Sequence, residues 1–234
     1  MPLDLEKAKL AWNQIYGGML ESETEKGIVK NYSKHAAAYD QCLQDIGYNI
    51  PTTVAELVMK YGNLGSNSQV LDVGVGTGLL GEELNKLGFS GKLDGIDGSE
   101  GMLNVAKNKG IYRDLIQQFL TPGCTLDVGD VKYDAIACVG TFSSSHVAPS
   151  VAKCFFKHVK TGAPVIISAR LFENSTEDSK FLAELRCMFQ EICYSGEALL
   201  LCEHPTNYYG VNFFTNENDP SKPCPGACFC LAKT

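Results

Sequence analysis

The sequence predicts an α/β domain with a seven-stranded, mostly parallel sheet, helices on both faces, an antiparallel edge pair and an N-terminal helical segment. Three observations support this fold class. Apolar residues recur at helical spacing in the first 60 residues, and short apolar runs then alternate with helical stretches. The last two strands follow one another without a helix between them. Such alternation forms βαβ crossovers, which cover both faces of a parallel sheet.

The N-terminal segment is expected to be helical. Trp12 and Tyr16 lie one helical turn apart, and the stretch 51–62 begins with Pro51 and ends at Gly62, which are helix start and stop signals. The chain has 234 residues, of which 44% are hydrophobic, and this size suits one globular domain. We therefore expect a single domain over residues 1–234.

Strands and helices alternate through the middle of the chain. Strands are expected at residues 69–74, 91–97, 115–120, 133–142 and 164–170. Helices are expected at residues 78–88, 99–110, 148–160 and 181–196. The final two strands are expected at residues 197–209 and 226–234, joined by a polar connection at 215–226. Because no helix separates them, they should pair antiparallel at an edge of the sheet.

The charge balance restricts the class of partner. A net charge of −7 without clustered Lys and Arg argues against a nucleic-acid or anionic-membrane surface, because both need cations to neutralise phosphates. No stretch approaches the ~20 apolar residues that span a bilayer, and the N-terminus lacks the apolar run of a signal peptide. The sequence predicts a soluble, cytoplasmic protein with no nucleic-acid or membrane partner.

The cysteines are expected to be reduced core thiols. Most of the ten lie in apolar segments, where a free Cys behaves as a small hydrophobic side chain. Cys224, Cys228 and Cys230 suggest a metal site, but a structural zinc needs four ligands in paired short spacings and no fourth is evident. We therefore expect no metal.

The stretch VLDVGVGTGLLG, residues 70–81, places four glycines directly after a run of branched apolar residues. Gly76, Gly78 and Gly81 satisfy the G-x-G-x-x-G spacing of a dinucleotide site, in which the backbone approaches a pyrophosphate closely. Another nucleotide-derived ligand could occupy the same loop. The glycines alone do not choose between the two ligands.

Two carboxylates lie near this loop: Asp97 would suit either ligand, and Asp72 favours an ammonium-bearing one. Asp97 ends the second strand, where it can accept hydrogen bonds from both hydroxyls of a ribose. Asp72 lies at the end of the first strand, where its charge repels a pyrophosphate and suits a cationic amino group. Met102 lies one helical turn beyond Ser99, so its thioether can lie against a purine.

Three motifs resemble those of a known family. VLDVGVGTG, LDGIDGSEGML and YDAIACVGTF resemble motif I, the strand-two acid and the strand-four motif of the class I S-adenosylmethionine-dependent methyltransferases. The resemblance extends from about Asn31 to Arg170. More narrowly, NYSKHAAAYDQCLQDIGYNIP and VGTFSSSHVAP resemble the Williams-Beuren-region methyltransferase group. This resemblance implies a Rossmann-like fold, S-adenosylmethionine as cofactor and S-adenosylhomocysteine as product.

The resemblance also implies roles for individual residues. Tyr32 resembles the lid aromatic that closes over the cofactor, and Tyr39 lies on the same helical face. Residues 1–62 are accordingly expected to form a helical lid and cap over a core of residues 63–234. The remaining cofactor residues are expected to contact methionine, ribose or adenine: Asp72, Gly74, Gly76, Gly78, Asp97, Gly98, Ser99, Met102 and Gly140.

The third strand departs from the family pattern. Many class members carry an acidic residue at its end that binds the adenine amino group, whereas LIQQFL has none. The carbonyl oxygen of Gln118 could supply this polar contact.

The chemistry implied is in-line methyl transfer to a small-molecule acceptor, which requires alignment rather than a metal or a covalent nucleophile. His146, in the loop after the fourth strand, could act as a general base, although a loop histidine can equally be structural or solvated. The aromatic residues that could line the acceptor pocket are Trp12, Tyr16, Tyr208 and Tyr209.

Two alternatives remain open at this point. The first is an NAD-dependent oxidoreductase on a similar sheet. The second is a cofactor-binding fold that acts as a non-catalytic partner module, which the altered third strand and the few acid–base groups suggest.

Overall fold

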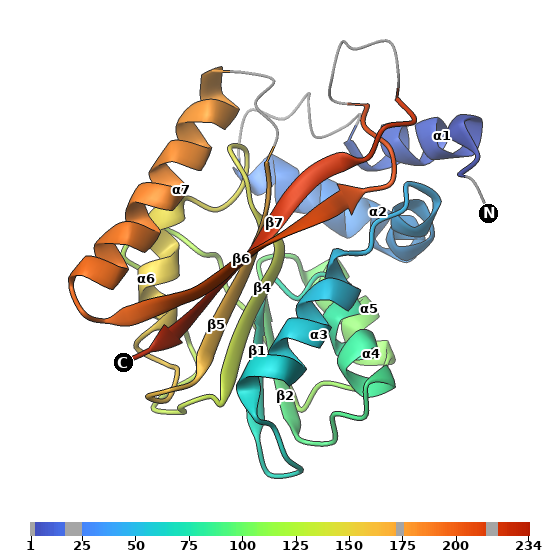
Figure 1. The fold of residues 1–234 in the computed structure, drawn as a ribbon. Coiled ribbons are helices and arrows are strands. Elements are labelled where there is room, and N and C mark those ends of the chain that lie inside the picture. Colours follow the sequence, from blue (N-terminus) through green and yellow to red (C-terminus); the bar gives the residue numbers. More distant parts are fainter. Residues whose placement is uncertain (1–2, 17–24, 172–175, 214–219) are drawn as a thin grey trace.

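A seven-stranded sheet in the order β3-β2-β1-β4-β5-β7-β6 forms the centre of the computed structural model, which describes residues 3–16, 25–171, 176–213 and 220–234 (Figure 1). The strands are β1 (Gln69–Val73), β2 (Lys92–Asp97), β3 (Asp114–Gln117), β4 (Ala135–Phe142), β5 (Pro164–Arg170), β6 (Ala198–Tyr209) and β7 (Cys224–Lys233). The first five strands are parallel, and β7 pairs antiparallel with both β5 and β6. The predicted fold class, including its antiparallel edge pair, is confirmed.

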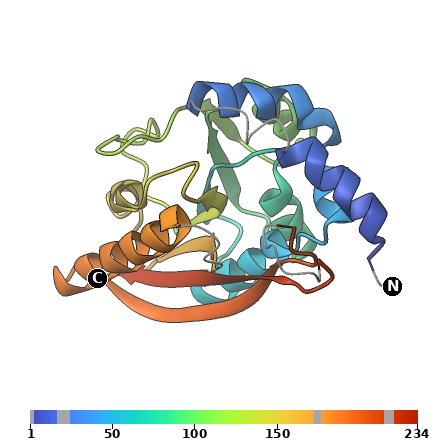
Figure 2. The ribbon, with the colours of Figure 1, turned by 90° about the horizontal axis from the view of Figure 1, so that it is seen from above.

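Helices cover both faces of this sheet, and the two N-terminal helices lie at the end of the sheet where the parallel strands finish (Figures 1 and 2). They are α1 (Leu5–Tyr16), α2 (Glu25–Asp45), α3 (Ile50–Gly62), α4 (Leu79–Lys86), α5 (Glu100–Asn108), α6 (Ala152–Phe155) and α7 (Thr176–Tyr194), with a 3-10 turn, η1 (Pro149–Val151), before α6. None of the helices among the described residues has the length and apolar character needed to cross a membrane.

Successive strand residues contribute to opposite sides of the core, as the two-residue period of a strand requires. Leu71 in β1 packs in a cluster with α6 and α7, whereas its neighbour Val70 packs in a second cluster with α3 and α4. Both side chains are completely buried. This double burial explains why the sequence shows continuous apolar runs instead of alternation.

Several predicted boundaries differ from the structure, and strand β3 ends at Gln117 instead of at the expected residue 120. The helix expected at 148–160 is only η1 and α6, because the chain beyond Phe155 returns to the sheet and the Tyr133 N–H donates to the His158 carbonyl at 2.8 Å. Helix α7 begins at Thr176, before the expected residue 181. Strand β7 begins at Cys224, inside the stretch expected to be a loop, of which residues 215–219 lie outside the described part of the chain.

A polar cluster around Asp94 in β2 joins this strand to the segments that precede β3 and β4. Asp94 is 2% exposed and accepts hydrogen bonds from the Arg113 Nε at 2.8 Å and the Tyr133 hydroxyl at 2.9 Å. Arg113 also bonds the second carboxylate oxygen, so the guanidinium and carboxylate meet in a bidentate pair. The pair holds the segment before β3 against β2.

Substitution of Asp94→Ala should lower the free energy of unfolding by about 3 kcal/mol, because it leaves the guanidinium and a buried phenol without their acceptor. Urea denaturation of the two proteins measures this difference. Asp114→Ala is the matched control: Asp114 also contacts Arg113, at 3.1 Å, but it is exposed and its removal should cost less than about 1 kcal/mol. Equal losses in the two variants would contradict the assigned role.

Candidate functional site

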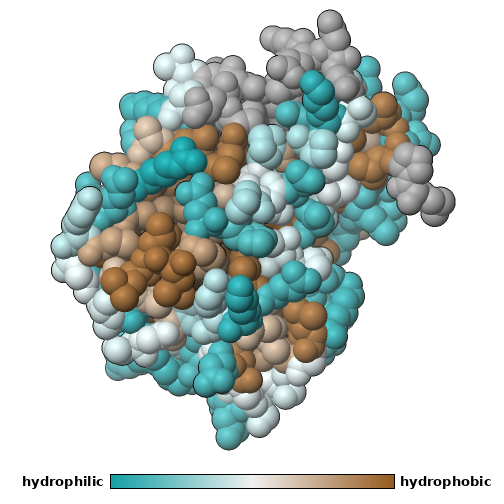
Figure 3. Space-filling view, viewed as in Figure 1, coloured by the Kyte–Doolittle hydropathy of each residue, from teal (hydrophilic) through white to brown (hydrophobic). Residues whose placement is uncertain are grey.

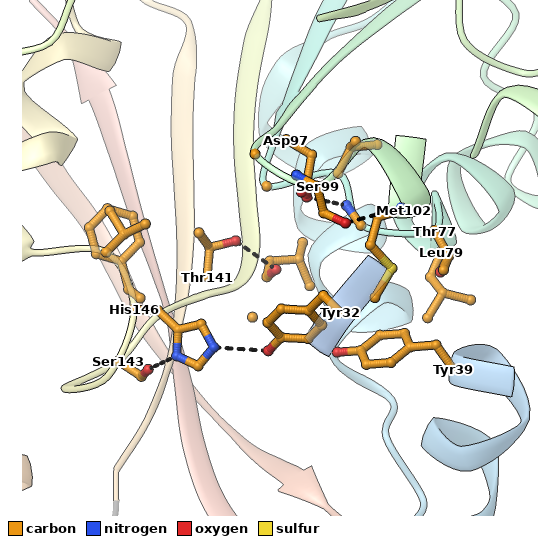
Figure 4. A pocket seen from close by; sticks show the side chains of 18 of the residues that line it. Tyr32, Tyr39, Thr77, Leu79, Asp97, Ser99, Met102, Thr141, Ser143 and His146 are labelled. Carbon is orange, nitrogen blue, oxygen red and sulfur yellow. Dashed lines mark hydrogen bonds between the residues drawn. The ribbon is translucent and has the colours of Figure 1, made fainter. Parts of the chain in front are cut away.

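The carboxyl ends of β1, β2, β4 and β5 open into a cavity of about 190 Å³ that α2 borders (Figure 4). Ligands of open α/β sheets bind at this edge, where neighbouring parallel strands end together. The cavity is lined by 15 predicted site residues: Tyr16, Tyr32, Tyr39, Asp72, Gly74, Gly76, Asp97, Gly98, Ser99, Met102, Gln118, Gly140, His146, Tyr208 and Tyr209.

The turn after β1 depends on glycine. Gly74 and Gly76 have φ angles of 76° and 53°, in the region that L side chains rarely adopt. A Cβ added to Gly74 would overlap Thr141 Oγ1, whereas one added to Gly76 would meet nothing within 4 Å. Gly76 therefore exposes its backbone to open space in the cavity. Gly78 instead caps α4, with its Cα against the Tyr112 ring, and does not line the cavity.

Asp72 is a buried carboxylate with one unsatisfied oxygen. It is 1% exposed; its Oδ2 accepts a hydrogen bond from the Tyr112 hydroxyl at 2.7 Å, while its Oδ1 has no partner among the described residues. Burial raises the pKa of Asp72 to about 7, the Tyr112 hydrogen bond opposes this shift, and the charge of Asp97 adds to it. A cationic donor in the cavity would satisfy this oxygen and favour the ionised form.

Asp97 is fixed by the backbone around it. Its Oδ2 accepts from the Gly76 N–H and its Oδ1 from the Ser99 N–H, both at 2.8 Å. Burial raises its pKa, and these backbone hydrogen bonds oppose the shift. Each carboxylate oxygen keeps a lone pair with which it can accept a hydrogen bond from a further donor.

The residues beside Asp97 form a separate wall of the cavity. Ser99 caps α5, its Oγ accepting from the Met102 N–H at 3.2 Å, and Figure 4 shows the Met102 thioether extending into the space beside it. Gln118 lines this end too, but its amide holds a loop: it donates to the Thr125 carbonyl at 2.6 Å and accepts from the Asp127 N–H at 2.9 Å.

The geometry does not favour His146 as a general base. Its Nδ1 lies 2.6 Å from Ser143 Oγ and 2.9 Å from Ser145 Oγ, and its Nε2 lies 2.9 Å from the Tyr32 hydroxyl. Burial, and to a lesser extent the charge of Arg170, lowers the pKa of His146 to about 4. A neutral imidazole with both nitrogens engaged and this weak basicity is suited to orienting Tyr32.

The far end of the cavity contains an aromatic group that only partly matches the prediction. Tyr16, Tyr208 and Tyr209 line it, but Trp12 does not, because its ring packs behind Tyr16 and Tyr209 with centroids 4.5 and 5.5 Å away. Of the four aromatic candidates for the pocket, Trp12 is thus a core residue, because α1 directs its side chain inward.

Sequence reasoning missed three residues of the site. Arg170 lines the cavity, and its position as the last residue of β5 at the carboxyl edge was an available signal. Tyr48 lies between α2 and α3, within the stretch NYSKHAAAYDQCLQDIGYNIP but with no role assigned to it, and Tyr112 precedes β3 outside the quoted motifs. Tertiary packing brings the Tyr48 hydroxyl beside Gly140 and the Tyr112 hydroxyl to Asp72.

Helix α2 is held across the cavity by polar contacts with α5 and the glycine turn. Asp40 accepts from the Thr77 hydroxyl and from the Lys109 ammonium, the latter at 2.7 Å, and Ser33 Oγ lies 2.8 Å from Ser99 Oγ. Tyr32 reaches the loop after β4 through its contact with His146 (Figure 4). These contacts place Tyr32 and Tyr39 against the cavity, with ring centroids 5.7 Å apart.

The C-terminal cysteines belong to the core. Cys224, Cys228 and Cys230 are all buried in the apolar cluster that contains α3. Burial raises the pKa of each thiol, which favours the neutral form over a metal-binding thiolate.

A family model described as a methyltransferase domain matches residues 70–162, which include the glycine turn, Asp97 and β4. These residues form a methyltransferase domain. The class expected from the sequence, the class I S-adenosylmethionine-dependent methyltransferases, is confirmed by this match and by the fold. The narrower Williams-Beuren-region group stays a prediction.

The methyltransferase domain has a curated relative in human methyltransferase-like protein 27, with 33% identity over 122 residues. The match covers 50% of this chain and spans about half the length of that relative, 47%.

Two solved structures share its fold. The magnesium protoporphyrin IX methyltransferase of Synechocystis with bound S-adenosylhomocysteine aligns over 97% of this chain and 95% of its own, at a TM-score of 0.56 and 15% identity. A Haloferax volcanii methyltransferase in complex with the Trm112 activator aligns over 86% of this chain and 97% of its own, at a TM-score of 0.62 and 14% identity.

Asp72→Asn should change how the stability of the unliganded methyltransferase domain depends on pH. The raised pKa means that native Asp72 retains a proton that the unfolded chain releases above about pH 4, so its contribution to stability falls as the pH rises from about 4 to 7. The variant cannot ionise, so its free energy of unfolding should rise relative to wild type across this window.

Urea denaturation at pH 5, 6, 7 and 8 measures the difference, and the exposed substitution Asp127→Asn is the control. Wild type and Asp72→Asn curves that run parallel through this range would show that Asp72 is ionised throughout.

Proposed function

We propose that this protein transfers the methyl group of S-adenosylmethionine to a small-molecule acceptor by in-line displacement. The observation that carries the proposal is the unsatisfied, buried Oδ1 of Asp72 beside the open backbone of Gly76 in a methyltransferase domain. An ammonium group satisfies that oxygen, whereas a pyrophosphate would be repelled by it. The residues present therefore fit this cofactor better than a dinucleotide.

The cofactor would lie along the turn from β1 to the start of α5. Asp72 would pair with the ammonium group, Gly74 and Gly76 would admit the methionine portion, and Asp97 would accept the two ribose hydroxyls. Gly98, Ser99 and Met102 would border the adenine, with Gln118 at its edge. When bound, S-adenosylmethionine supplies a methyl group already activated on a sulfonium.

The chain's own residues would then align the reactants and exclude water. Tyr32 and Tyr39 present aromatic rings to the cavity, and aromatic faces favour a nearby positive charge by ~0.5–2 kcal/mol. His146 would hold Tyr32 in position through the 2.9 Å contact. Gly140, near the end of β4, carries no side chain, so the Tyr48 hydroxyl can lie close to its backbone where both residues line the cavity. Alignment of this kind is the main requirement of a displacement reaction.

A small acceptor is favoured by the walls of the cavity. Six tyrosines line it, namely Tyr16, Tyr32, Tyr39, Tyr48, Tyr208 and Tyr209, and α2 borders it. The net charge of −7 disfavours a nucleic-acid substrate. A cavity with aromatic walls suits a metabolite better than a macromolecule.

The N-terminal helices would act as a lid in the same single domain. In this proposal, residues 1–62 cap a core of residues 63–234, and α2 provides the part that contacts the cofactor region. Asp40 and Ser33 make its contacts with the opposite side of the cavity. Release of the cofactor would require these contacts to break.

A cytoplasmic location accompanies the proposal. Six of the ten cysteines are buried in the core, where they pack as free thiols. Free thiols persist in a reducing compartment.

The proposal is tested by titrating the protein with S-adenosylhomocysteine and with NADH, and by measuring S-adenosylhomocysteine release from S-adenosylmethionine with panels of amines, phenols, thiols and carboxylates. We expect binding of the first ligand only, with turnover on one acceptor class. Tight NADH binding would select an oxidoreductase. Binding of S-adenosylhomocysteine without any turnover would select a non-catalytic module.

Asp97→Ala should weaken S-adenosylhomocysteine binding by a factor of about 5 to 150, because two charge-assisted hydrogen bonds worth roughly 1–3 kcal/mol are lost. Isothermal titration calorimetry measures the change. Asp114→Ala, an exposed carboxylate two strands' width from the turn, is the control and should leave the dissociation constant unaltered. An unchanged constant for Asp97→Ala would refute the ribose assignment.

Asp40→Ala should raise the dissociation rate of S-adenosylhomocysteine about fivefold, since a partly exposed ion-pair network of roughly 1 kcal/mol no longer holds α2. Stopped-flow fluorescence measures the rate. Lys34→Ala, which removes an exposed side chain from the same helix, provides the comparison. Equal rates for the two variants would argue against the lid.

A further inference from the structure

The end of the cavity opposite the glycine turn has a different chemical character. Arg170 lies there at the end of β5, within electrostatic reach of Tyr16, Tyr208 and Tyr209. These phenol side chains come from α1 and β6, so elements far apart in sequence surround one guanidinium. Burial disfavours the charged form of Arg170, but the net shift of its pKa is upward because electrostatic interactions with ionisable neighbours, Tyr209 first, outweigh the effect of burial.

The charges along the cavity are separated by sign. Among its described lining residues, the carboxylates are Asp72 and Asp97, both beside the glycine turn, and Arg170 is the one Lys or Arg side chain. A bound ligand at the turn therefore faces negative charge, while a ligand at the far end faces positive charge. Complementary charge of this kind selects partners and fixes their orientation.

Hydrogen-bond donors reinforce the positive end. A Cβ on Gly140 would lie 2.6 Å from the Tyr48 hydroxyl and 3.4 Å from the Tyr208 hydroxyl, so both phenols face the end of β4. The Tyr16 and Tyr209 hydroxyls bond each other beside them. Burial raises the pKa of Tyr208 and Tyr48, so both remain protonated donors at neutral pH.

We infer that the acceptor is a small organic carboxylate whose carboxylate group binds Arg170 and whose body lies between the tyrosine rings. The inference rests on the proposed function and specifies its substrate class. A guanidinium matches a carboxylate in a planar, bidentate pair. A carboxylate held at this end directs the rest of the molecule back toward Gly140 and the glycine turn, as in-line transfer requires.

The test compares benzoate with its uncharged analogue benzamide. Each is titrated by calorimetry into the protein, free and saturated with S-adenosylhomocysteine. Wild type should bind benzoate at least tenfold more tightly than benzamide. Arg170→Met should reduce this preference to twofold or less, and Arg170→Lys should retain part of it. Arg186→Met removes an exposed arginine on α7 and should behave as wild type.

A second measurement uses the natural ligands. The protein and S-adenosylmethionine carrying a deuterated methyl group are incubated with a deproteinised cell extract, and labelled products are identified by mass spectrometry. The labelled product should retain a free carboxylate and carry the label on another atom, and its yield should fall more than tenfold in Arg170→Met. Circular dichroism and thermal melting establish that each variant is folded.

Several outcomes would overturn the inference. These are equal binding of benzoate and benzamide by wild type, a benzoate preference that persists in folded Arg170→Met, or a labelled product from an acceptor without a carboxylate. A tenfold weaker affinity for S-adenosylhomocysteine in Arg170→Met, with benzoate preference unaltered, would assign Arg170 to the cofactor carboxylate instead. Failure of wild type to bind S-adenosylhomocysteine would refute the proposed function, while titration of the free protein would still report on Arg170.

Discussion

The hydrogen bond from the Gly76 N–H to Asp97 is the contact on which the site depends, because it joins the turn after β1 to the end of β2. Parallel pairing of β1 and β2 places Val73 opposite Ile96, so both strands end at one level and this bond can form. It orients a carboxylate and shapes the glycine turn at once. The positive φ of Gly74 and Gly76 makes the bend available without steric cost.

The same region concentrates unfavourable electrostatics in the unliganded protein. Asp72 is buried and Asp97 is partly buried, burial raises the pKa of each, and Asp72 Oδ1 has no partner among the described residues. Buried charges without full hydrogen bonding reduce stability. A ligand that supplies both a cation and hydroxyl donors would stabilise such a site most. The same two carboxylates thus reduce the stability of the unliganded protein and prepare the site for binding.

Most elements of the fold could be predicted because local signals agree with the tertiary context. The short apolar strands, the glycine-terminated helices and the missing crossover helix before β7 all appear in the structure. The prediction at 148–160 failed since apolar spacing typical of a helix also arises where a chain packs against the core. There, Val159 forms a bridge with Tyr133 and ends the helix early. Packing, not propensity, sets that boundary.

The sequence by itself determined which strand each motif follows, the glycine turn, both carboxylates and the class of enzyme. Each of these features lies within a single segment and is recognised from the types and spacing of its residues. Tertiary structure alone decided which aromatic side chains face the cavity: it directs Trp12 into the core and brings Tyr48, Tyr112 and Arg170 to the site. It also showed that His146, a candidate base from the sequence, contacts the Tyr32 hydroxyl and has a lowered pKa. Side-chain direction and burial depend on contacts between distant segments, and a single sequence does not encode these contacts as a local pattern.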